Sequence, residues 1–242
     1  MKLTLEKALE LMAADDGDLD LEYCSDYDSL PDELARVTGN LNLMCSSISA
    51  IPESLMLVCK NFDMRDTKIA KLPSEFRVYG DLLIDDTNVI EHLPEELEVG
   101  GTLSLCHSNV RDLPENLLVG ELDISFTDIS ELPKNLTVKE SLCLAFSKIT
   151  SLPDDLLVDG DLELNDLNLD HFPKNLCVRG FLDLDGTRIN GKVITEKDLP
   201  EDLNVKGCVY FSNNKVTRSF DKYRAIQNKI KEYQQQLEEL QR

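Results

Sequence analysis

The nine prolines of this 242-residue chain all stand in one register, and this register constrains the fold more than any other feature. Each proline follows a large apolar residue and is the second residue of a repeat of about 20 residues. One repeat carries too little apolar surface to fold alone, so its core must come from the repeats on either side. The repeats begin at Leu30, Ile51, Leu72, Leu93, Leu113, Leu132, Leu152, Phe172 and Leu199.

The shared pattern of the repeats is L-P-x-x-L-x-V-x-G-x-L-x-L-x-x-T-x-I. Its alternating centre, as in Leu162-Glu163-Leu164, predicts a short strand, and in-register copies predict a parallel sheet with strands about 4.8 Å apart. The Val-x-Gly element can add a second short strand. Acids follow the proline, as in Pro94-Glu95-Glu96, which indicates at most a single turn of α- or 3₁₀-helix. We expect the extra residues 190–198 to loop out.

The repeats predict a solenoid with helical caps at both ends. Residues 1–16 form the N-terminal cap, with a helix over residues 4–14 that Thr4 can cap. Residues 17–218 form the solenoid, a half repeat followed by nine repeats. Residues 219–242 carry apolar residues at heptad spacing and predict a C-terminal helix. This helix either folds over the last repeat or pairs with a second copy as a coiled-coil homodimer.

The net charge of −21 disfavours direct binding to nucleic acid or to an anionic membrane surface, because both need a basic face. Seven cysteines without a C-x-x-C motif indicate reduced thiols rather than a disulfide framework or a zinc site. The N-terminus is no secretory signal, and no stretch is long and apolar enough to span a membrane. We therefore expect a cytoplasmic protein, in the producing cell or in a cell that receives it.

A short hydroxyl side chain follows the second strand leucine by three positions in most repeats, as in Thr67, Thr87 and Thr127. Such side chains bind nearby backbone groups. We expect this column to be structural and to satisfy backbone groups of the next repeat.

The repeat resembles the leucine-rich-repeat superfamily, in the short bacterial and phage form that carries L-P-x-x-L in its variable half. The resemblance covers roughly residues 17–218 and departs from the family where Thr or Ser replaces the usual asparagine. Some bacterial effectors with such repeats carry a ubiquitin-ligase domain, and nothing in this chain is long enough to be one. The resemblance implies protein binding through the concave sheet face.

Acidic residues dominate the outward positions that flank the strand leucines, where Arg65 is the one base. Aspartate is a poor strand former, and like charges on adjacent strands repel, so we expect these acids to serve binding. The alternative is that this face merely shares the acidity of the whole chain. The acids predicted to bind a partner are Asp63, Asp81, Asp85, Asp86, Glu121, Asp123, Asp161, Glu163, Asp183 and Asp185.

The middle of this face is nearly uncharged, and Phe126 and Phe146 occupy the same position of neighbouring repeats there. An aromatic centre with a charged surround is typical of a binding hot spot. We predict that His107, Phe126 and Phe146 belong to the partner site. The alternative is that both phenylalanine rings turn inward and form core.

No motif of a catalytic, phosphate-binding or calcium-binding site appears, and the three histidines lie in different repeats. We therefore predict a non-enzymatic protein, without cofactor or metal, that acts as an adaptor or inhibitor by binding a basic protein surface or peptide. One alternative is an acidic mimic of nucleic acid that inhibits a DNA- or RNA-binding protein in defence or counter-defence. Another is a bacterial effector that acts in a host cell.

Overall fold

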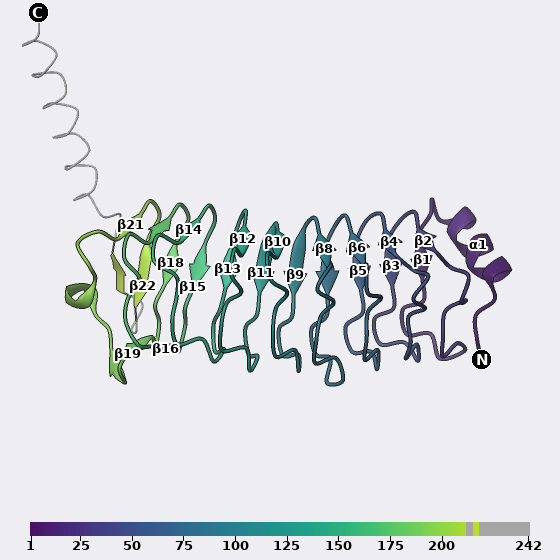
Figure 1. Ribbon diagram of the computed structural model, residues 1–242, viewed down its shortest axis with the longest axis horizontal. Coiled ribbons are helices and arrows are strands. Elements are labelled where there is room, and N and C mark those ends of the chain that lie inside the picture. Colours follow the sequence, from purple (N-terminus) through teal and green to yellow (C-terminus); the bar gives the residue numbers. More distant parts are fainter. Residues whose placement is uncertain (212–214, 218–242) are drawn as a thin grey trace, which may run out of the picture.

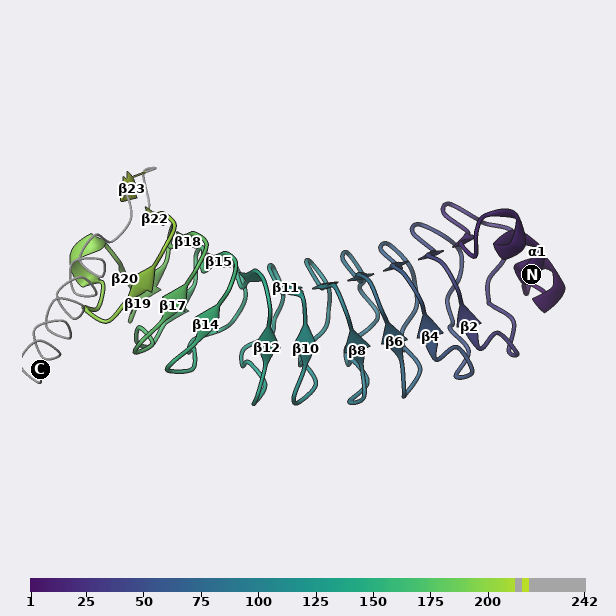
Figure 2. The ribbon, with the colours of Figure 1, turned by 90° about the horizontal axis from the view of Figure 1, so that it is seen from above.

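The computed structural model describes residues 1–211 and 215–217, and these residues form a β-solenoid with one N-terminal α-helix (Figure 1). Each turn of the solenoid is called a coil here and is numbered by its repeat, so coil 1 begins at Leu30 and coil 9 at Leu199. The coils stack side by side along the long axis, and the stack curves gently (Figure 2). The predicted solenoid is confirmed, while the predicted C-terminal helix over 219–242 lies outside the described residues.

One long sheet of 11 strands runs the length of the molecule, with β1 from the half repeat, one strand from each of the nine coils, and β23 after the strand of coil 9. Its strands pair in parallel and in register, except the last, which is antiparallel to its neighbour. The order is β1 (Leu19–Asp20), β3 (Leu41–Asn42), β5 (Phe62–Asp63), β7 (Leu82–Leu83), β9 (Thr102–Ser104), β11 (Glu121–Asp123), β13 (Leu142–Cys143), β15 (Leu162–Glu163), β18 (Leu182–Asp183), β22 (Val209–Phe211) and β23 (Lys215–Thr217).

The Val-x-Gly element forms a second row of short parallel strands, as the pattern allowed. This row is interrupted twice, so that it consists of three separate small sheets. The first contains β2 (Arg36–Val37), β4 (Leu57–Val58), β6 (Arg77–Val78) and β8 (Glu98–Val99). The second contains β10 (Leu118–Val119) and β12 (Thr137–Val138). The third contains β14 (Leu157–Val158), β17 (Cys177–Val178) and β21 (Asn204–Val205).

The extra residues of coil 8 form a hairpin that leaves the stack. Strand β16 (Asn168–Leu169) pairs in parallel with β19 (Arg188–Ile189), and β19 pairs antiparallel with β20 (Lys192–Val193). A 3₁₀-helix, Glu196–Asp198, follows before the chain re-enters the repeat at Pro200. The predicted excursion over 190–198 is therefore present.

The core lies between the two rows of strands and is continuous from coil to coil. In coil 7, for example, Val158, Leu162, Leu164 and Leu169 are all buried. These positions repeat in every coil, so each coil covers the apolar residues of the next. This arrangement gives the stack an interior that no single repeat could form.

Both described ends of the stack are covered. The helix α1 (Leu5–Ala14) buries Ala8 and Met12 against the first coil, and the Thr4 hydroxyl caps it by accepting from the N–H of Lys7 at 3.3 Å. At the other end β23 pairs with the outer edge of β22. The helix thus covers the apolar end of the first turn, and β23 becomes the edge strand at the other end.

The Leu-Pro segments form β-turns rather than the helical turn expected from sequence. In coil 1 the N–H of Leu34 donates to the Pro31 carbonyl at 3.1 Å. The acids after proline also act differently from the expectation. The Glu53 carboxylate accepts from the N–H of Ser74 at 3.2 Å, and that of Asp154 from Lys174 N–H at 2.9 Å. They therefore join neighbouring coils and do not serve a helix dipole.

The hydroxyl column is buried and structural, as predicted, but most of its bonds stay within one coil. The hydroxyls of Thr67, Thr87 and Thr127 donate to the carbonyl three residues earlier at 2.7, 2.8 and 2.7 Å. Thr187 alone among these threonines reaches another coil, donating to the Leu164 carbonyl at 2.7 Å. The column thus closes the turn that follows each strand.

Candidate functional site: the outer face of the long sheet

The outer face of the long sheet carries every residue that the sequence predicted for partner binding. These residues fall into four columns that run across the strands, one residue from each coil. The entry column contains Asp81, Glu121 and Asp161, and the strand column contains Asp63, Asp123, Glu163 and Asp183. The exit column contains Asp85 and Asp185. The turn column contains Asp86, His107, Phe126 and Phe146.

The entry column is a hydrogen-bonded ladder between coils. The Asp81 carboxylate accepts from the N–H of Thr102 at 2.8 Å, and the Asp161 carboxylate accepts from the N–H of Phe181 at 2.8 Å. Asp18 accepts from Asn40 in the same way at 2.7 Å. These acids therefore have a role in the fold, in addition to any role in binding.

The strand column also has a structural reason for its aspartates. The carboxylates of Asp63, Asp123 and Asp183 accept from the N–H two residues later at 3.1, 2.8 and 2.9 Å. This local bond is one that short Asx side chains make where a strand gives way to a turn. The argument that fold stability alone would not select these aspartates is therefore too strong.

The strand register also limits repulsion between these acids. Asp63 faces Leu83, and Asp123 lies between Ser104 and Cys143. Only Glu163 and Asp183 are adjacent acids among the predicted members of this column. Neutral side chains therefore separate Asp63 from Asp123 by three strand spacings and Asp123 from Glu163 by two, roughly 10–15 Å.

Two carboxyls on this face have raised pKa values. Burial raises the pKa of Asp85, although the Ser104 hydroxyl and the Cys106 N–H donate to it. Burial also raises the pKa of Glu163, and the nearby acids, Asp183 first among them, add to the effect. Burial therefore favours proton uptake at Asp85 and Glu163, and neighbouring acids add to this effect.

Two thiols lie among these carboxylates. Burial is the main cause that raises the pKa of Cys106 and of Cys143, and the charge of Asp123 raises both further. The Cys143 thiol lies 3.5 Å from the Glu163 carboxylate. A thiol in such surroundings stays protonated, so neither cysteine is an activated nucleophile.

The turn column has left-handed backbone geometry. His107, Phe126 and Phe146 have φ values of 56°, 55° and 57°, and Asp86 and Asp166 share this geometry. Gly186 occupies the same position in coil 8, with φ of 68°. Left-handed geometry disfavours bulky side chains and favours Gly, Asn and Asp, so the fold does not itself call for aromatic residues here.

The three rings of the turn column form an aromatic ladder. The centroids of His107 and Phe126 are 4.3 Å apart with planes at 15°, and those of Phe126 and Phe146 are 4.4 Å apart with planes at 9°. Phe126 and Phe146 are 45% and 44% exposed, so they are not core residues. The alternative that both rings turn inward is therefore wrong.

The ladder lies beside small, uncharged side chains. Ser125 and Ala145 precede the two phenylalanines in the exit column, and both are buried. In the turn column Asp86 precedes the ladder and Asp166 follows it. The arrangement is an exposed aromatic centre with a carboxylate at each end.

Among the described residues, most of the acids on this face have no cation paired with them. Arg65 pairs with Asp63 at 2.6 Å, Lys60 with Asp18 at 3.5 Å and Arg188 with Asp166 at 3.8 Å. Within residues 1–211 and 215–217, no hydrogen bond or ion pair reaches the side-chain carboxylates of Asp86 or Asp185. The face therefore remains strongly negative.

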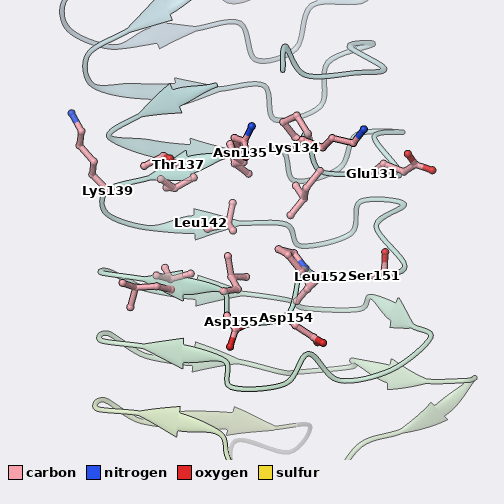
Figure 3. Close-up of a pocket in the computed structure, with 18 of the residues that line it drawn as sticks. Glu131, Lys134, Asn135, Thr137, Lys139, Leu142, Ser151, Leu152, Asp154 and Asp155 are labelled. Carbon is pink, nitrogen blue, oxygen red and sulfur yellow. The ribbon is translucent and has the colours of Figure 1, made fainter. Parts of the chain in front are cut away.

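A cleft of about 890 Å³ lies elsewhere, between coils 6 and 7 on the side of the second strand row (Figure 3). Leu132, Leu136 and Val138 are only half-buried there, whereas the corresponding residues of most other coils are buried. No strand pairing joins β12 to β14 within the described residues, and this gap coincides with the cleft.

Among the described residues, this junction also lacks a hydrogen bond between coils that other junctions have. Glu53, Glu115 and Asp154 follow prolines and accept from an N–H of the next coil. In coil 6 this position is Lys134, which has no acceptor to offer to Asp154 N–H, although a lysine at the same position of coil 8, Lys174, leaves β17 and β21 paired. Figure 3 shows Lys134 and Asn135 on one side of the cleft and Asp154 and Asp155 on the other.

Comparison with known proteins gives no relative: no protein-family model, no curated protein and no solved structure matches the chain. Within the described part of the chain, no helix has the length and apolar character needed to cross a bilayer. The same residues contain no group of three or more His, Cys, Asp or Glu side chains arranged to hold a metal ion.

Proposed function

We propose that this protein is a non-catalytic protein-interaction module that binds a basic protein surface or peptide on the outer face of its long sheet. The observation that carries the proposal is the exposed His107–Phe126–Phe146 ladder, held in left-handed geometry that bulky side chains disfavour. Exposed rings at the centre of a charged face are typical of binding hot spots. The unpaired carboxylates around it would steer a positive partner.

We further propose that the repeats are of the leucine-rich-repeat type and that the protein acts in the cytoplasm. The period of about 20 residues, the L-x-L strands and the buried hydroxyl column support the first proposal. The second is supported by the seven cysteines, all of which are free.

The proposal is tested with a fluorescein-labelled peptide that contains both arginine and lysine, whose binding is followed by fluorescence polarisation. Combined Phe126→Ala and Phe146→Ala should weaken binding at least tenfold. Tyr79→Ala is the matched control, because Tyr79 is 63% exposed and follows β6 in the second strand row. Binding that is insensitive to salt, or that the double variant leaves unchanged, would refute the proposal.

A second candidate is mimicry of nucleic acid. Three nearly parallel rings at steps of 4.3 and 4.4 Å, bordered by carboxylates, resemble stacked bases bordered by phosphates. A mimic should compete with DNA or RNA for its partner, whereas a plain adaptor should not. Competition by an oligonucleotide, measured once a partner is in hand, separates the two.

A further inference from the structure

The two ends of the aromatic ladder differ in what lies beside them. The outer face of the Phe146 ring is directed towards coil 7, where Asp166 is the next member of the turn column. The outer face of the His107 ring is directed towards coil 3, where the next member is Asp86. Each end therefore combines a flat ring with a carboxylate.

The Asp166 end is already engaged within the chain. The Asp166 carboxylate lies 3.8 Å from a guanidinium nitrogen of Arg188. It also leans over Gly186, since a Cβ atom on that glycine would come within 2.5 Å of its Oδ1 atom. This end shows that a carboxylate of the turn column can pair with a guanidinium.

The Asp86 end is open. The Asp86 carboxylate is exposed and, among the described residues, has no hydrogen-bond or ion-pair partner. An aspartate side chain is much shorter than an imidazole side chain, so it leaves the distal part of the exposed His107 ring uncovered. Asp85 beside it cannot take the same role, because it is half-buried and already accepts from Ser104 and Cys106.

We infer that the Asp86 end of the ladder binds an arginine of the partner, with the guanidinium stacked on the His107 ring and paired with the Asp86 carboxylate. The inference rests on the proposed function and specifies its chemistry. A guanidinium is flat, stacks on rings and donates in a fork to a carboxylate. A lysine ammonium is a compact, strongly hydrated charge that gains less from a flat ring.

Two fluorescein-labelled peptides test the inference, identical in a glycine-serine background except that one carries arginines where the other carries lysines. Polarisation is measured on the whole protein at pH 8, where histidine side chains are ordinarily neutral. The arginine peptide should bind about threefold to tenfold more tightly, as expected for one stacked cation with forked hydrogen bonds.

The preference for arginine should fall to about one in Asp86→Asn and in His107→Ala. Two matched controls should keep the preference, even where the affinity for both peptides falls: Asp185→Asn, an exposed acid of the same face that has no side-chain partner among the described residues, and Asp166→Asn at the engaged end. Thermal unfolding of each variant shows whether it is folded. If both peptides bind the native protein equally, and Phe126→Ala combined with Phe146→Ala weakens this binding, the arginine site is overturned and the proposed function stands. Binding of neither peptide overturns both.

Discussion

The rings of Phe126 and Phe146 stack face to face, 4.4 Å between centroids, on residues whose φ values are 55° and 57°. Left-handed geometry costs a residue with a Cβ atom about 1 kcal/mol. An aromatic pair contributes about 0.5–1.5 kcal/mol, and these rings remain almost half exposed. The backbone cost of the two residues together, about 2 kcal/mol, is at least as large as the stacking gain of the pair. Stability therefore does not explain why this position holds phenylalanine in two adjacent coils.

Replacing both rings by glycine separates binding from stability. In Phe126→Gly with Phe146→Gly, relief of the left-handed backbone offsets the lost stacking, so the free energy of unfolding should change by less than about 1 kcal/mol. Binding of a basic peptide should weaken at least tenfold. Urea denaturation and polarisation measure the two quantities. A stability loss above about 3 kcal/mol would show that the rings act as core.

The acids of the outer face should divide into two groups when each is replaced by alanine. Asp81→Ala leaves the half-buried N–H of Thr102 without its 2.8 Å partner and should lower the free energy of unfolding by about 1–2 kcal/mol. Asp185→Ala removes an exposed carboxylate that has no partner in the described part of the chain, and it should change the free energy of unfolding by less than about 0.5 kcal/mol. Urea denaturation of both variants checks this, and equal effects would contradict a structural role for the entry column.

The fold could be predicted from the sequence because its period is so regular. Prolines in one register fix the length of each coil, and the alternation of leucines fixes which side of each strand is buried. The N-terminal helix was predicted from the spacing of Ala8 and Met12, both of which are buried. The antiparallel strand β23 was not predicted, since its residues lack the L-x-L alternation.

The candidate site was predicted only in part. The columns followed from strand alternation, but the reasons for their acids did not, because bonds such as Asp123 to Ser125 N–H depend on the local backbone. Glycine at position 186, in register with Phe146 and Asp166, was a usable signal for left-handed geometry. No feature of the sequence indicated that Asp166 pairs with Arg188, because Arg188 lies on β19 in the next coil.

Raised pKa values on the outer face make stability depend on pH in a defined direction. Burial raises the pKa of Glu163 above its value in the unfolded chain, so the folded state binds this proton more tightly. The ionised carboxylate therefore costs stability at pH 7, and the cost shrinks as the pH falls through the folded-state pKa and is gone below the unfolded-state pKa. Glu163→Gln should be more stable than the native protein at pH 7, with a smaller difference at pH 5.

Acids with lowered pKa values set the lowest pH at which the effect of Glu163 on stability can be measured by itself. The backbone N–H of Asn40 lowers the pKa of Asp18, and the Thr195 hydroxyl and Lys192 lower that of Asp198 to about 2. Their contribution is present above pH 4 and is lost as the pH falls below it. Urea denaturation between pH 4.5 and 7 therefore avoids these acids, and the difference between Glu163→Gln and the native protein removes the contribution of Asp85, which both share. If the free energy of unfolding of Glu163→Gln depends on pH in the same way as that of the native protein, the raised pKa of Glu163 is contradicted.

Backbone opening should concentrate at the cleft between coils 6 and 7. The N–H groups of Cys177 and Arg179 in coil 8 donate to carbonyls of coil 7 at 2.9 Å. The corresponding groups in coil 7, those of Leu157 and Asp159, have no such bond to β12 among the described residues. Hydrogen exchange at Leu157 and Asp159 should therefore be at least tenfold faster than at Cys177 and Arg179.

A substitution in coil 6 tests the same junction. Lys134→Gln supplies an acceptor for the N–H of Asp154 and should slow exchange at Asp154. Lys148→Gln, a surface change in the same coil, should not. Equal exchange in β14 and β17 would mean that the two coils close over the cleft in solution.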